Sequence, residues 1–89
     1  MQKVLQDFSI GKNIRRIREK NGMKQIKLVT EMQVRGSKVT DTTLSKIEGG
    51  YRNIRVSDLV ILQEIFNVSY NEFFKDLSVE FIQNMQDNF

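Results

Sequence analysis

Apolar residues recur at helical spacing along most of the chain, and short polar or glycine-rich segments separate the periodic stretches. Ser9 stands before the first such stretch and Gly22 follows it, as expected for a helix start and a helix end. Ser69 and Glu72 form the Ser-x-x-Glu pattern of a capping box. The pattern predicts α-helices over residues 9–21, 23–32, 40–48, 56–66 and 69–74.

The predicted helix over residues 40–48 has both ends marked. Thr40 is a good N-cap, and the glycine pair at positions 49–50 allows a left-handed turn after the helix. Its two apolar residues, Leu44 and Ile47, define a narrow inward face. Its outward face carries groups that form hydrogen bonds, namely Asp41, Thr42, Ser45 and Lys46. We interpret it as a helix that the rest of the domain holds in place and presents to a partner.

The fold class expected from these patterns is all-α, with the five helices above and a sixth helix over residues 78–89. In that last segment Phe81, Ile82, Met85 and Phe89 lie on one face, which we expect to pack on the fourth helix or on a second subunit. The predicted core consists of Ile14, Ile17, Ile26, Val29, Leu44, Ile47, Leu59, Leu62, Phe66 and Val68.

Composition removes several classes of function. The 89 residues contain no Cys and no His, which excludes disulfides, Cys/His metal sites and a histidine general base. No apolar run reaches the roughly 18 residues of a membrane span, and the N-terminus lacks the features of a secretory signal. We therefore expect a cytoplasmic protein that is not an enzyme and has no cofactor, metal or small-molecule substrate.

Charge is unevenly distributed along the chain. Residues 9–55 contain 12 Lys/Arg and 4 Asp/Glu, whereas residues 56–89 contain 1 and 6. The basic part is expected to attract a polyanion, although a solvated charged surface is the simpler alternative.

The order of these elements resembles the phage-repressor/Cro-like (XRE) helix-turn-helix family. The resemblance rests on residues 14–25, Leu28, residues 43–50 and residues 67–74, and it extends over about residues 9–74. It implies a compact five-helix bundle in which the second and third helices form a helix-turn-helix DNA-binding unit. Residues outside the resemblance are interpreted from the sequence pattern: residues 1–8 as an N-terminal extension, and residues 75–89 as a C-terminal amphipathic helix for packing or dimerisation.

The resemblance also implies roles for individual residues. The family positions that meet base edges are matched by Asp41, Thr42 and Lys46. Two further positions that contact DNA are matched by Gln25 and Arg52. Arg18 matches an arginine that pairs with the glutamate matched by Glu48. We add Ser45 to the base contacts because it lies on the same outward face. The residues alone also allow simpler roles. Asp41 would stabilise the first turn of its helix as a negative charge at the N-terminus, and Lys46 would be an ordinary solvated lysine. The expected phosphate contacts are Gln25, Thr43, Arg35, Lys38 and Arg52.

Three positions and one connection depart from the family pattern. Lys24 replaces the usual Ser/Thr cap of the second helix, Val29 replaces a small residue, and Ile54 stands where proline is common. The connection between the second and third helices is about five residues longer than usual and includes Arg35, Gly36, Ser37 and Lys38.

These observations favour a sequence-specific regulator of transcription, repressor-like, that binds double-stranded DNA as a homodimer. The alternative is a protein-interaction module on the same fold (an antirepressor, antitoxin or adaptor) whose acidic C-terminal third is the working surface.

Overall fold

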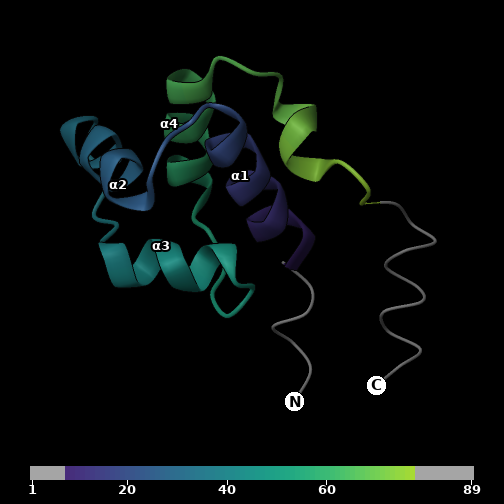
Figure 1. Ribbon diagram of the computed structural model, residues 1–89, viewed down its shortest axis with the longest axis horizontal. Coiled ribbons are helices and arrows are strands. Elements are labelled where there is room, and N and C mark those ends of the chain that lie inside the picture. The colour runs from purple at the N-terminus through teal and green to yellow at the C-terminus, as the bar shows by residue number, and fades with distance from the viewer. Residues whose placement is uncertain (1–7, 78–89) are drawn as a thin grey trace.

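The computed structural model describes residues 8–77, which form an all-helical bundle (Figure 1). Among these residues there is no strand, so the all-α prediction is confirmed. The fifth element is a 3₁₀ helix and not the α-helix expected from the sequence. The expected sixth helix, with Phe81, Ile82, Met85 and Phe89, lies outside the described residues. The elements are α1 (Phe8–Lys20), α2 (Gln25–Val34), α3 (Asp41–Glu48), α4 (Val56–Phe66) and η2 (Tyr70–Phe74).

Side-chain and glycine signals set several of these boundaries. Thr40 Oγ1 accepts a hydrogen bond from the Thr43 amide (3.2 Å) and so caps α3, as predicted. Gly50 follows α3 with a φ of +82°, a conformation that glycine adopts without strain. Ser69 starts η2, but its hydroxyl accepts from the Asn71 amide (3.2 Å) and not from Glu72, so the predicted capping box is not formed as expected.

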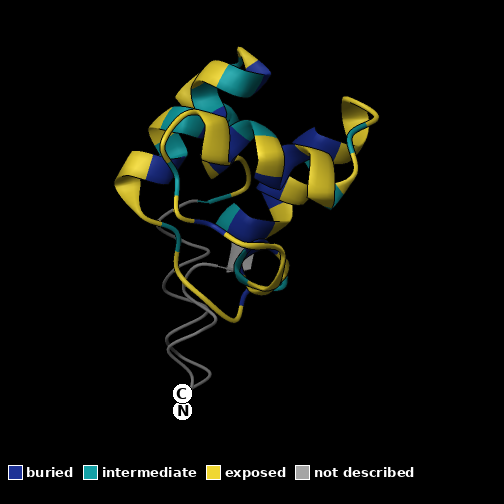
Figure 2. Ribbon diagram, turned by 90° about the vertical axis from the view of Figure 1, so that its left-hand side faces the viewer, coloured by how far each residue is buried: buried dark blue, intermediate teal, exposed yellow. Residues whose placement is uncertain are grey.

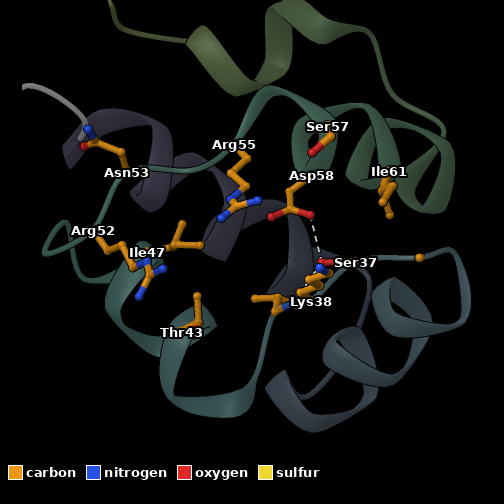
Figure 3. Close-up of a pocket in the computed structure, with 12 residues that line it drawn as sticks. Ser37, Lys38, Thr43, Ile47, Arg52, Asn53, Arg55, Ser57, Asp58 and Ile61 are labelled. Atoms are coloured by element: carbon orange, nitrogen blue, oxygen red, sulfur yellow. Dashed lines mark hydrogen bonds between the residues drawn. The ribbon is translucent and has the colours of Figure 1, made fainter.

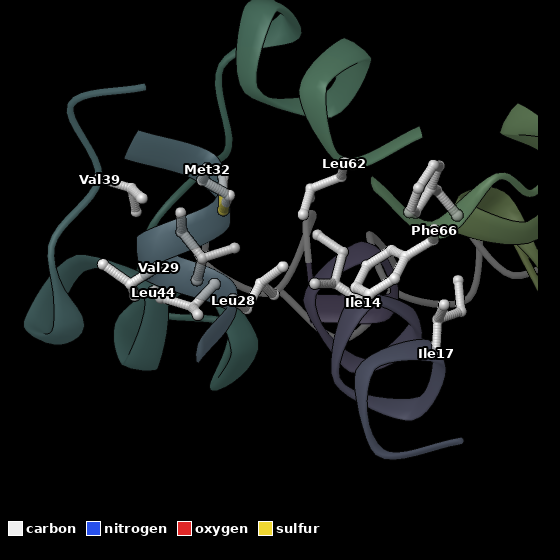
Figure 4. Close-up of a cluster of buried hydrophobic side chains, with 11 residues drawn as sticks. Ile14, Ile17, Leu28, Val29, Met32, Val39, Leu44, Leu62 and Phe66 are labelled. Carbon is white, nitrogen blue, oxygen red and sulfur yellow. The ribbon is translucent and has the colours of Figure 1, made fainter. Parts of the chain in front are cut away.

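The core lies between α1, α2, α3 and α4, with η2 closing it beside α1 (Figure 4). In Figure 2 the buried parts of the helices face the middle of the bundle and the exposed parts face outward. Leu44 is fully buried, which confirms the inward face predicted for α3. Leu59 and Val68 are only partly buried and pack against the core. The buried apolar residues are Ile14, Ile17, Leu28, Val29, Met32, Val39, Leu44, Ile47, Leu62, Phe66 and Phe73.

The prediction that Ile26 belongs to the core is wrong. Its side chain is 63% exposed, whereas Leu28 is fully buried. Two positions along a helix differ by about 200° in direction, so these two side chains point to nearly opposite faces. The stripe that α2 buries is Leu28, Val29 and Met32.

Helix α1 comes unusually close to α3 at Gly11. A Cβ atom at this position would overlap the backbone carbonyl oxygen of Ile47. Glycine therefore allows the backbone of α1 to lie directly against α3. At the same end of the bundle, the buried Asn13 side chain donates hydrogen bonds to the carbonyls of Phe73 (3.1 Å) and Lys75 (2.8 Å), which ties η2 to α1.

The long connection between α2 and α3 has a defined conformation. Gly36 has a φ of +99°, and the Ser37 hydroxyl donates to Asp58 Oδ1 in α4 (2.7 Å). The same hydroxyl accepts from the Val39 amide (3.1 Å), and Gln33 Nε2 donates to the Val39 carbonyl (2.8 Å). The extra residues are thus fastened to both α2 and α4.

Candidate nucleic-acid interface

Helix α3 lies along one edge of the bundle (Figure 1), and the residues on its outward face are polar. Leu44, Ile47 and Glu48 are buried on its inner side, and Thr43 is half-buried. The exposed outer positions offer one carboxylate, two hydroxyls and one ammonium group, so they both donate and accept hydrogen bonds. The exposed residues are Asp41, Thr42, Ser45 and Lys46.

The inner end of α3 is held by a buried ion pair with α1. Arg18 Nε donates to Glu48 Oε2 (2.7 Å) and Arg18 Nη2 donates to Glu48 Oε1 (3.0 Å), a bidentate geometry. The Arg18 and Glu48 side chains are only 9% and 3% exposed. A third guanidinium bond goes from Nη1 to the Met23 carbonyl (2.7 Å), in the turn between α1 and α2.

Gln25 connects the first residue of α2 to this pair. Its Nε2 donates to Glu48 Oε1 (2.9 Å), and its side chain is half-buried. Lys24 precedes the helix without a side-chain cap, so the first amides of α2 have no partner from a capping side chain. Free amides at a helix start are a favourable environment for a phosphate group. The resemblance identified Gln25 as a phosphate contact but gave no indication of its bond to Glu48.

The basic residues expected to contact phosphate differ in their surroundings. Arg35 donates to Glu31 Oε1 (2.8 Å) and lies 3.9 Å from Glu64 Oε2, so carboxylates of α2 and α4 already engage it. The hydrogen bonds from Arg35 and then Lys27 lower the pKa of the Glu31 carboxyl. Lys38 and Arg52 are exposed, and within residues 8–77 they form no ion pair or side-chain hydrogen bond.

Sequence reasoning missed three structural contributors to this site. Gly11 carries no motif, because its role depends on the position of α3. Asn13 lies in an otherwise ordinary polar position of α1. The Ser37–Asp58 bond joins residues 21 positions apart, for which the only sequence signal is an acidic residue in the first turn of α4.

An all-helical bundle with a supported, polar, outward-facing third helix is the architecture of helix-turn-helix DNA-binding domains. The profile of the helix-turn-helix family matches residues 14–73, and the chain belongs to this family, in agreement with its XRE-like motifs. No curated protein and no solved structure matches the chain. Within residues 8–77, no helix has both the length and the apolar character needed to cross a membrane.

Proposed function

We propose that the chain is a sequence-specific regulator of transcription that binds double-stranded DNA, with α3 in the major groove and a repressor-like mode of action. The observation that carries this proposal is the exposed polar face of α3, supported from behind by Leu44, Ile47 and the Arg18–Glu48 pair. The major groove is wide enough for a helix and displays a distinct set of donors and acceptors for each base pair. The net positive charge of residues 9–55 favours the approach of a polyanion.

The direct test is a fluorescence-anisotropy titration with random duplex DNA, followed by selection of preferred sequences from a random library. Binding at low salt and enrichment of one sequence support the proposal. An absence of binding to any duplex, with the domain folded, would point to the protein-interaction module instead.

In this proposal α3 reads bases through Thr42 and Lys46. Lys46→Ala or Thr42→Ala is expected to reduce the preference for the selected site over random DNA by about 1–3 kcal/mol per lost base contact. The measurement is the ratio of the two dissociation constants at one salt concentration. Lys75→Ala is the matched control for Lys46, because it removes an exposed lysine outside the helix-turn-helix unit. An unchanged ratio for both α3 variants would contradict base reading by this face.

Ser45 and Asp41 lie on the same face and are proposed as further base contacts.

Phosphate contact is proposed for Gln25, Thr43, Lys38 and Arg52, and to a smaller extent for Arg35, since its carboxylate partners compete for it. Lys38→Ala and Arg52→Ala are expected to weaken binding to all sequences alike, because phosphate contacts carry no base information. Each should also flatten the slope of log affinity against log salt by about 0.9. A salt titration with selected and random duplexes measures both effects. Unequal losses for the two duplexes would reassign the residue to base reading.

We also propose that the protein acts as a homodimer. One helix as short as α3 spans few base pairs, and a two-fold pair doubles the recognised sequence. Sedimentation equilibrium at micromolar concentration, with and without DNA, is expected to show the dimer mass. A monomer under both conditions removes this proposal and leaves DNA binding intact.

A further inference from the structure

A pocket of about 240 Å³ lies beside α3, between the α2–α3 connection and the start of α4 (Figure 3). Its floor is partly apolar and includes Val39, Ile47 and Ile61. Around this floor the lining is polar and basic, and in Figure 3 the Arg55 side chain reaches toward the space between α3 and α4. The polar and charged lining residues are Ser37, Lys38, Thr43, Arg52, Asn53, Arg55, Ser57 and Asp58.

Within the described residues, the positive charge of this pocket is not balanced by negative charge. Lys38, Arg52 and Arg55 supply three positive charges, and within residues 8–77 none of them forms an ion pair or a side-chain hydrogen bond. Elsewhere in the bundle, by contrast, Arg15, Arg16, Arg18, Lys27 and Arg35 each lie within 4.0 Å of a carboxylate. Three cations lining one pocket repel one another unless an anion lies between them.

Among the described residues that line the pocket, Asp58 is the only acid, and it already forms a hydrogen bond. It is 8% exposed and accepts the short hydrogen bond from the Ser37 hydroxyl (2.7 Å). Its carboxylate offsets one of the three cations, so the pocket keeps a formal charge of +2. The hydrogen bond between Asp58 and Ser37 holds the α2–α3 connection in place, and this connection forms one wall of the pocket.

The two basic walls are fixed before any ligand arrives. Lys38 lies between Ser37, which is bonded to α4, and Val39, which is bonded to Gln33 and buried. On the other side the Tyr51 amide donates to the Lys46 carbonyl (2.8 Å), which fixes the start of the linker that carries Arg52. Binding here requires little ordering of the backbone.

We propose that this pocket binds one phosphate group, with Lys38, Arg52 and Arg55 as the cationic partners and the Thr43 and Ser57 hydroxyls as donors. The phosphate belongs either to the DNA backbone or to free phosphate in solution. Two of the lining residues, Lys38 and Arg52, are already proposed to contact DNA phosphate, which favours the DNA backbone, and to that extent the inference rests on the proposed function. Arg55, which the sequence did not indicate as a contact, becomes part of the binding surface.

The experiment compares the wild-type chain with Arg55→Gln and Lys38→Gln, using Lys75→Gln as a control that removes one positive charge elsewhere. Thermal unfolding first establishes that all four proteins are folded. Amide NMR spectra are then recorded during titration with inorganic phosphate, with chloride at equal ionic strength as the reference. DNA affinity is measured across salt concentrations.

If a DNA phosphate occupies the pocket, Arg55→Gln and Lys38→Gln each flatten the salt slope and the control does not. Because the three cations share one phosphate, the change for each single variant is at most about 0.9. Phosphate-specific shifts at the Arg55 and Ser57 amides that disappear in Arg55→Gln, with an unchanged salt slope, identify free phosphate as the ligand. The same shifts in a protein that binds no DNA support the pocket and defeat the proposed function. Neither a phosphate-specific shift nor a change in slope overturns the inference.

Discussion

Glu48→Gln is expected to reduce the free energy of unfolding by about 3–5 kcal/mol, the range found when one partner of a buried ion pair is removed. The reason is that the guanidinium of Arg18 remains in a buried position, 2.7 Å from a group that no longer carries a charge. Small domains are stable by only about 5–15 kcal/mol in total, so much of the stability would be lost. Urea denaturation followed by circular dichroism measures the change.

Two further variants distinguish the stability effect of the buried Arg18–Glu48 pair from that of an exposed ion pair. Replacing both Arg18 and Glu48 with apolar residues of similar size should be far less harmful, since no unpaired charge remains. Glu19→Gln is the matched control, because Glu19 pairs with Arg15 on the surface, where the two side chains are 56% and 60% exposed. Exposed pairs of this kind contribute at most about 1 kcal/mol. Equal stability of Glu48→Gln and wild type would show that the buried pair contributes nothing measurable.

Leu44→Ala is the second substitution with a large expected effect, a loss of about 2–5 kcal/mol in the free energy of unfolding. Leu44 is fully buried and is one of the two apolar residues that fasten α3 to the core. Removing its methyl groups leaves a cavity beneath α3, and the favourable free energy of burying those atoms is lost. The same urea experiment measures the loss.

The control for Leu44 is Val56→Ala, at a position that is 78% exposed. Surface substitutions of this kind usually change stability by no more than about 0.5 kcal/mol. Similar values for the two variants would contradict the assignment of the inner face of α3.

The sequence predicted α3 and α4 to within one residue, because Thr40 and the glycine pair mark α3 and a dense apolar run marks α4. It placed the start of α2 two residues early, at Met23, whose carbonyl instead accepts from Arg18 in the turn. Ile26 was misassigned because a short helix with apolar residues on both sides does not show which face is buried.

The outward face of α3 was predictable from the same periodicity, but the partners of the polar residues were not. Nothing local indicates that Gln25 donates to Glu48, that Arg35 lies 3.9 Å from Glu64 Oε2, or that Ser37 reaches Asp58. These contacts join residues by tertiary packing, and in the α2–α3 connection there is no periodicity to reveal which side chain points inward.

The hydrogen bond between Gln25 and Glu48 fixes the separation between the first residue of α2 and the end of α3. In the proposed binding mode, which has α2 at the phosphate backbone and α3 in the groove, this separation sets the groove width that the protein fits. A duplex whose groove is too narrow or too wide must deform to fit, and stiff and flexible base steps differ in the energy this requires. The protein should therefore distinguish sequences by DNA shape at base pairs that none of its side chains touches.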